Sequence, residues 1–177
     1  YLVDGSSYVY RAFFAIRQQL STSRGLPTKA VFGFKNMLQK LIRDEKPQYL
    51  GVAFDERGPT FRHVVDPSYK AHRPSMPDDL AVQLPYIHRL VEALDIPKLS
   101  LAGYEADDIL GTLARRFEAE EYAVVLVTGD KDLCQLVTDH ITILDTMKDQ
   151  RIGVAEVRER FGVGPEGVID VLGLMGD

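Results

Sequence analysis

The order of apolar and polar positions along the chain predicts alternating strands and helices. Short apolar runs typical of buried strands occupy residues 1–3, 49–54, 98–101, 123–127 and 141–144. Between and after them, apolar residues recur at helical spacing over residues 28–44, 80–94, 105–117, 154–161 and 166–174. This alternation is typical of an α/β fold, in which a mostly parallel central sheet is flanked by helices on both faces.

Proline and acidic residues mark one helix start and leave one long irregular connection. The sequence Met-Pro-Asp-Asp at 76–79 predicts the beginning of a helix that runs to Leu94 and that Pro85 kinks. Residues 56–75 show no regular pattern, and a connection of that length is usually functional or mobile. It carries the basic residues Arg57, Arg62, Lys70 and Arg73.

Composition narrows the class of protein. The 177 residues suit one soluble domain, and 45% of them are hydrophobic. The single cysteine, Cys134, cannot form an internal disulfide, which favours a reducing compartment and argues against a thiolate zinc site. No apolar run approaches the roughly 18 residues of a membrane span. The net charge of −5 argues against nucleic acid as a partner, but acids and bases are segregated along the chain.

The two ends of the sequence suggest a larger parent. The chain has no initiating Met and begins inside a strand-like run, and it ends at Asp177 with no stop signal. We therefore expect it to be a fragment of a longer protein.

Acidic residues follow three of the predicted strands. Asp4, Asp55 and Asp130 come at strand ends, Asp132 follows two residues later, and a predicted helix begins with Glu105, Asp107 and Asp108. Because ligands of open parallel sheets bind outside the carboxyl ends of the strands, these acids are expected to share one rim. Each acid alone is more often a turn former, a helix cap or a partner of the helix dipole.

The conjunction of seven carboxylates favours a metal site. They would repel one another unless cations neutralised them, and ligation by oxygen alone selects hard ions such as Mg²⁺ or Mn²⁺. Two such ions about 4 Å apart commonly activate water and stabilise the leaving oxygen in phosphodiester cleavage.

Basic and aromatic residues supply candidate nucleic-acid contacts. One helical turn between Lys70 and Arg73 would point both side chains to the same phosphate, although a solvated surface is an equal alternative. Tyr10 and Arg11 follow Asp4 closely, so they offer a ring for stacking on an unpaired base and a cation near the rim. A Tyr10 buried in the first helix is the comparable alternative.

Six short motifs follow one another along the chain. They are Leu-Val-Asp-Gly-Ser-Ser-Tyr at 2–8, Ala-Phe-Asp at 53–55, Tyr-Lys-Ala-His-Arg-Pro at 69–74, Glu-Ala-Asp-Asp at 105–108, Thr-Gly-Asp-Lys-Asp at 128–132 and Leu-Met-Gly-Asp at 174–177. In this order they resemble the motifs of the 5′-nuclease domains of bacterial DNA polymerase I, within the flap-endonuclease family. The resemblance covers nearly the whole chain. It implies one catalytic domain over residues 1–177 with a PIN-like fold, in which residues 56–80 form a helical arch, or gateway.

The resemblance also implies roles for individual residues. A first ion, Mg²⁺ or Mn²⁺, would be held by Asp4, Asp55, Glu105 and Asp107, and a second would be surrounded by Asp107, Asp130, Asp132 and Asp177, with Asp108 in support. In the arch, which also contains Tyr69, the side chains of Lys70 and Arg73 would contact the scissile phosphate. Tyr10 and Arg11 would lie near the displaced nucleotide. No catalytic role falls to His63, His72, His88 or His140.

The implied reaction is hydrolysis of DNA at 5′ flaps, nicks and RNA primers, in the bacterial cytoplasm at the nucleoid, with a polymerase region following in the parent. In the family, the position of Asp177 is followed by another acidic residue and then by a helix-hairpin-helix-like segment that binds duplex DNA. We therefore expect this fragment to be weak or inactive.

Three other functions remain open from the residues. The first is a PIN-like ribonuclease with a similar carboxylate rim, against which the Tyr-Lys-x-x-Arg sequence of the arch argues. The second is a DNA-binding module without catalysis, against which the intact acids argue. The third is a Mg²⁺-dependent phosphatase of small molecules, which would leave the basic connection unexplained.

Overall fold

A six-stranded sheet in the order β3-β2-β1-β4-β5-β6 forms the centre of the computed structural model, which describes residues 1–176. The strands are β1 (Leu2–Asp4), β2 (Gly51–Ala53), β3 (Lys98–Leu99), β4 (Val124–Val127), β5 (Ile141–Asp145) and β6 (Gln150–Ile152). Strands β1 to β5 are parallel, and β6 is antiparallel to β5. The predicted mostly parallel sheet is therefore confirmed.

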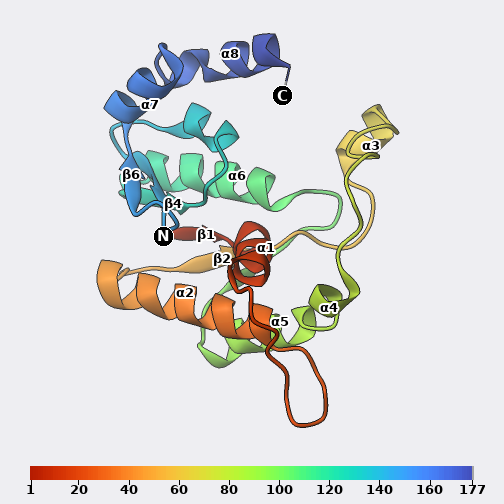
Figure 1. The fold of residues 1–177 in the computed structure, drawn as a ribbon. Helices are drawn as coiled ribbons and strands as arrows, with labels where there is room; N and C mark the ends of the chain where they lie inside the picture. Colours follow the sequence, from red (N-terminus) through yellow and green to blue (C-terminus); the bar gives the residue numbers. More distant parts are fainter. Residues whose placement is uncertain (177) are drawn as a thin grey trace.

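Helices cover both faces of this sheet, as the sequence predicts (Figure 1). They are α1 (Gly5–Ala15), α2 (Lys29–Glu45), α3 (Phe61–Val65), α4 (Asp78–Ala81), α5 (Leu84–Ala93), α6 (Ala106–Ala119), α7 (Val154–Phe161) and α8 (Val168–Met175). Short 3₁₀ helices occur at Asp132–Leu136 and Pro165–Gly167. Within the described part of the chain, none of the helices has the length and apolarity that a membrane crossing requires.

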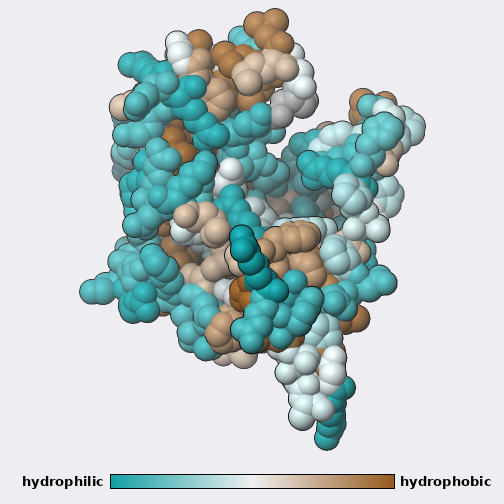
Figure 2. Space-filling view, in the orientation of Figure 1, coloured by the Kyte–Doolittle hydropathy of each residue, from teal (hydrophilic) through white to brown (hydrophobic). Residues whose placement is uncertain are grey.

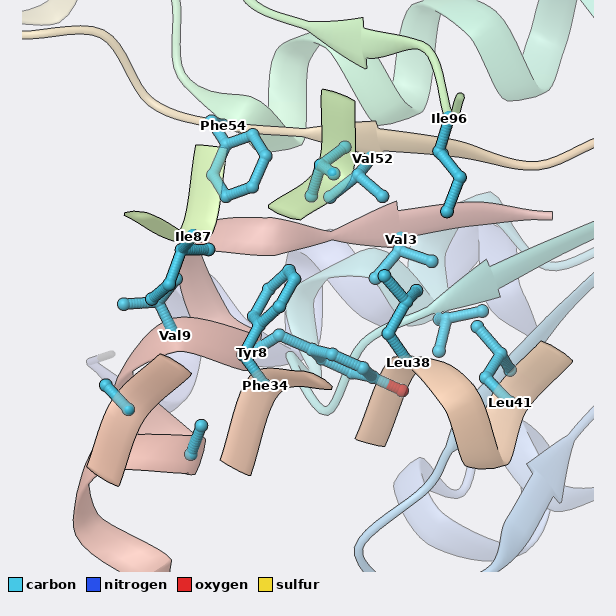
Figure 3. Close-up of a cluster of buried hydrophobic side chains, with 14 of the residues drawn as sticks. Val3, Tyr8, Val9, Phe34, Leu38, Leu41, Val52, Phe54, Ile87 and Ile96 are labelled. Atoms are coloured by element: carbon cyan, nitrogen blue, oxygen red, sulfur yellow. The ribbon is translucent and has the colours of Figure 1, made fainter. Parts of the chain in front are cut away.

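Two hydrophobic cores lie on opposite faces of the sheet because successive strand residues point to opposite sides. In β1, Val3 joins the core formed with α1, α2 and α5, where Tyr8, Phe34, Val52 and Ile87 pack (Figure 3). Its neighbour Leu2 joins the other core, which α6, α7 and α8 cover. Packing on both faces holds the sheet in place, and with it the positions of the residues at the strand ends.

The helix predicted over residues 80–94 is two helices, so the predicted kink at Pro85 is wrong. Helix α4 ends at Ala81 and α5 begins at Leu84, with Pro85 in its first turn, where a missing N–H costs little. Between them Gln83 is fully buried, and its amide oxygen accepts the N–H groups of Ala30 (2.8 Å) and Val31 (3.3 Å) at the start of α2. The break places Gln83 where it can cap another helix.

Strand β6 was not predicted from the sequence. Only Ile152 of its three residues is buried, so the strand carries no apolar run that a sequence pattern could reveal. It pairs with β5 through the register Ile143 to Ile152.

The order of the strands brings the carboxyl ends of β2, β1 and β4 side by side. From β1 the chain builds β2 and β3 on one side, then crosses through α6 to place β4 and β5 on the other. The crevice beside such a reversal is where open α/β sheets bind ligands.

The connection between β2 and α5 contains the predicted arch, residues 56–80, hereafter the arch segment. It holds α3, which buries none of its residues and protrudes from the body of the molecule (Figure 1). The segment ends inside α4, where Leu80 is fully buried in the core. Figure 2 shows a hollow between the protruding α3 and the rest of the molecule.

Candidate active site

Four carboxylates from three strand ends and one helix form a cluster, hereafter the rim cluster: Asp4, Asp55, Asp107 and Asp130. Asp4 is the last residue of β1, Asp55 and Asp130 follow β2 and β4, and Asp107 lies in the first turn of α6. Burial raises the pKa of Asp107 to about 7, and the negative charges of Asp4, Asp130 and Asp55 contribute to this rise. The mutual repulsion shows that the sheet topology brings these acids together, as predicted.

Asp4 is the most enclosed member of the rim cluster, with 5% of its surface exposed. Its Oδ1 accepts the N–H of Ser7 at 2.8 Å and thereby caps α1, and its Oδ2 accepts the hydroxyl of Thr128 at 3.0 Å. Burial raises the pKa of Asp4, and the charges of Asp55 and Asp130 raise it further. Asp4 thus serves both as a helix cap and as a rim carboxylate.

Asp55 and Asp130 are also fixed by local hydrogen bonds. The carboxylate of Asp55 accepts the N–H of Ala106 at 2.7 Å, which ties the end of β2 to the start of α6. Asp130 accepts the N–H of Asp132 at 2.9 Å, in a turn that leads into the 3₁₀ helix. Asp132 itself is exposed.

Glu105 and Asp108, the other two acids at the start of α6, are engaged by the arch segment. Glu105 accepts hydrogen bonds from Lys70 Nζ at 2.7 Å and from the Tyr69 hydroxyl at 3.1 Å. Asp108 receives both terminal nitrogens of Arg62 at 2.7 Å, and its Oδ2 also accepts the N–H of Glu105 at 2.9 Å. The Arg62 guanidinium holds the pKa of Asp108 below its usual range.

The donor chemistry of the rim fits a hydrated hard cation. Among residues 1–176 no three His, Cys, Asp or Glu side chains are arranged to enclose a metal ion by themselves, and Asp177 lies outside the described residues. A closed protein cage is not what Mg²⁺ demands, since it keeps several waters and binds through one or two carboxylates. The pKa of Asp107 is raised first by burial and then by the charges of the neighbouring aspartates, and a cation would neutralise those charges.

Lys70 and Arg73 do not share a helical turn. The N–H of Arg73 donates to the Lys70 carbonyl at 3.0 Å, but these residues lie in turns, and Lys70 has a left-handed backbone with φ of 57°. The Lys70 side chain reaches Glu105, whereas Arg73 is exposed. The structure therefore brings Lys70 to the rim and leaves Arg73 in solvent.

Tyr10 and Arg11 occupy different surroundings on α1. The buried tyrosine of this helix is Tyr8, whereas Tyr10 is 38% exposed and stacks on Phe14 with ring centroids 6.5 Å apart. Arg11 pairs with Asp145 at 3.3 Å. Its guanidinium lies against Gly129, where any side chain would collide with it.

The sequence did not single out Arg62 as a site residue. It appeared only as one basic residue among several, because its partner Asp108 is 46 positions away along the chain. No local pattern connects the two.

Solved structures show the same fold at low sequence identity. A T5 5′-exonuclease with bound zinc has a TM-score of 0.76 and 20% identity, over 99% of this chain and 66% of that one. A T5 flap endonuclease in complex with DNA and metal ions has a TM-score of 0.72 and 17% identity, over 99% and 65%. The fold is therefore that of the 5′-exonuclease and flap-endonuclease structures.

Sequence comparison gives the family. Residues 1–162 match the model of the 5′-3′ exonuclease N-terminal resolvase-like domain, so the chain belongs to this family, and the resemblance seen in the motifs is confirmed. DNA polymerase I of Pseudomonas aeruginosa is 54% identical over 176 residues, and the match covers 99% of this chain and 19% of that protein. A 5′-3′ exonuclease of Aquifex aeolicus is 45% identical over 177 residues, which are 61% of its length. The chain thus spans about a fifth and three fifths of these curated relatives.

Proposed function

We propose that this chain carries the 5′→3′ exonuclease and 5′-flap endonuclease activity of a longer protein and hydrolyses DNA phosphodiester bonds. The observation that supports this proposal most directly is the rim cluster, in which burial, and then the charges of three aspartates, raise the pKa of Asp107. Such a cluster costs folding energy unless cations occupy it, and the family to which the chain belongs acts on phosphodiesters.

The proposed cofactor is Mg²⁺ or Mn²⁺, in two or more positions. Its ligands, direct or through water, would be Asp4, Asp55, Glu105 and Asp107 at one position and Asp107, Asp130, Asp132 and Asp177 at the other. When bound, the ions would lower the pKa of water and stabilise charge on the phosphate oxygens. Asp108 would support the first turn of α6 without touching an ion, since Arg62 holds both of its oxygens.

The chain itself would bind and orient the substrate. Lys70 and Arg73 would neutralise the scissile phosphate, and Lys70 can do so only after it leaves Glu105. Tyr69 would move with Lys70, because both donate to the same carboxylate. The exposed ring of Tyr10 offers a stacking surface for an unpaired base, and Arg11 would act through its pair with Asp145.

The proposed substrates are DNA with 5′ flaps or nicks and RNA primers paired to DNA, met during replication and repair in the bacterial cytoplasm. A polymerase region would follow in the parent, as the match to about a fifth of a DNA polymerase I suggests. One similar fold was crystallised with DNA and metal ions, which supports the choice of partner.

A cleavage assay on a labelled 5′-flap duplex tests the proposal. This chain and a version extended beyond Asp177 should be compared in Mg²⁺, in Mn²⁺ and in EDTA. We expect cleavage by the extended protein only with divalent ions, and weaker cleavage by this chain. Unchanged cleavage in EDTA would contradict the metal requirement, and a preference for unstructured single-stranded RNA would favour the ribonuclease alternative.

A further inference from the structure

One guanidinium group of the arch segment is bound to the first turn of α6, the helix that carries Asp107 of the rim cluster. Both terminal nitrogens of Arg62 donate to the two oxygens of Asp108 at 2.7 Å, which is the bidentate geometry that Arg and carboxylate prefer. The same group lies 3.7 Å from Glu105 and over the ring of Phe61, 4.6 Å from its centroid. Arg62 therefore links the arch segment to the start of α6 through two carboxylates, while its ring contact stays within the arch segment.

The acid that Arg62 holds belongs to the cap of α6. Oδ2 of Asp108 accepts the N–H of Glu105, and the Glu105 side chain completes a capping box with Asp108. Glu105 and Asp107 are the two residues of this turn that the proposed function assigns to metal ions. The orientation of both thus depends on the turn that the Arg62–Asp108 pair fixes.

Lys70 makes a different kind of contact. It meets Glu105 through a single nitrogen, and its backbone is in the left-handed region, with φ of 57°. A non-glycine residue in that region stores conformational energy. Lys70 can therefore leave Glu105 for another partner, whereas Arg62 is expected to stay paired with Asp108.

We propose that Arg62 is a positioning residue that anchors the arch segment to the first turn of α6, and not a contact to phosphate. The effect of Arg62 on catalysis rests on the proposed function. The Arg62–Asp108 contact itself is present in this chain whatever its activity. Its charge is already neutralised by Asp108, and its side chain is 31% exposed. If Arg62 bound a phosphate instead, Asp108 would lose its guanidinium partner at the contact between the arch segment and α6.

Hydrogen exchange in EDTA tests the anchor without any need for activity. Peptides covering residues 61–73 and 104–110 should exchange about tenfold faster in Arg62→Ala, because loss of a bidentate charged pair favours local opening. Arg62→Lys, which restores one contact, should lie between the variant and the native chain. In an Asp108→Asn background, Arg62→Ala should add less than about a twofold change, since the two partners act as one unit.

Arg57→Ala is the matched control. Arg57 is exposed in the same segment, and it forms no ion pair within residues 1–176. Its loss removes the same charge and should leave exchange at 61–73 and 104–110 unchanged. Equal exchange in Arg62→Ala and the native chain, or equal acceleration by Arg57→Ala, would overturn the anchor.

The salt dependence of binding to a 5′-flap duplex in EDTA separates positioning from phosphate contact. A residue that neutralises one phosphate changes the slope of log affinity against log salt by about 1. We expect that change for Arg73→Ala and none for Arg62→Ala, with cleavage by Arg62→Ala falling through kcat more than through KM. A slope change of about 1 in Arg62→Ala would overturn the proposal. A chain that binds no DNA would contradict the proposed function, while the exchange data would still decide on the anchor.

Discussion

The side chains of Lys70 and Glu105 form a 2.7 Å ion pair between the arch segment and the first turn of α6. Glu105 is only 8% exposed, and it also accepts the Tyr69 hydroxyl. Burial acts to lower the pKa of Lys70, but its contacts with Glu105 and Tyr69 together outweigh burial and raise that pKa. Before any ion or substrate binds, a proposed phosphate contact and a proposed metal ligand therefore neutralise each other.

Replacing Lys70 by Ala should strengthen metal binding and weaken cleavage. Without the ammonium group, Glu105 is free to accept a cation, so the Kd for Mn²⁺ should fall about three- to tenfold. Loss of a cation at the phosphate should reduce kcat on a flap duplex about a hundredfold. Titration followed by electron paramagnetic resonance measures the first effect. Lys35→Ala, an exposed site on α2, is the control, and an unchanged Mn²⁺ affinity in Lys70→Ala would refute exchange at Glu105.

Asp130→Asn should abolish cleavage and leave DNA binding nearly intact. The substitution removes one charge from the rim cluster, although the amide oxygen can still accept the N–H of Asp132. Flap cleavage should be measured beside binding at the same salt concentration in EDTA. Residual cleavage within tenfold of the native rate would show that this carboxylate is not required.

Asp107 should make the metal-free chain less stable at higher pH. Its pKa in the folded chain is about 7, above its ordinary 3.8, so the folded state binds more protons than the unfolded state between these values. The free energy of unfolding should therefore fall as pH rises from about 4 to 7. Asp107→Asn should be neutral near pH 4 and stabilising at pH 8 by about 1 to 3 kcal/mol.

Denaturant unfolding in EDTA at both pH values measures this difference. Saturating Mg²⁺ should remove the advantage of Asp107→Asn, because the native carboxylate then gains a cation. The same stability difference at pH 4 and pH 8 would mean that Asp107 is not the group that titrates.

Gln83→Ala should lower the free energy of unfolding by about 2 to 3 kcal/mol, because it leaves N–H groups at the start of α2 unsatisfied. The native side chain also donates to the Asp79 carbonyl at 2.6 Å, so the variant loses the link between α4 and α2. Gln39→Ala, on the exposed side of α2, should change stability by less than about 0.5 kcal/mol. Equal effects of the two substitutions would contradict the capping role.

Strands β1 to β5 and the positions of the rim acids could be predicted because both depend on short-range information. A buried run such as 124–127 is visible in the sequence, and parallel topology then carries the acids that follow Val127 and Ala53 to one edge. The break between α4 and α5 was not predictable, since Gln83 finds its partner Ala30 at a distance of 53 residues.

Contacts of the basic side chains also lie beyond local patterns. Arg11 meets Asp145 across 134 residues, and nothing near either residue indicates the pair. The same is true of Arg62 and Asp108. The sequence shows which residues are charged. Only the folded chain shows which of them form ion pairs with one another.

The double engagement of Asp4 has a practical consequence for trapping a substrate complex. Its carboxylate caps α1 through Ser7 and receives Thr128 from β4, so a substitution there loosens two elements along with the rim. Loss of activity in an Asp4 variant could therefore come either from disturbed folding or from the loss of a catalytic carboxylate, and the two causes could not be separated. Asp107, whose pKa is raised by burial and by the neighbouring aspartates, is the better position for an inactive variant intended for crystallisation with intact DNA.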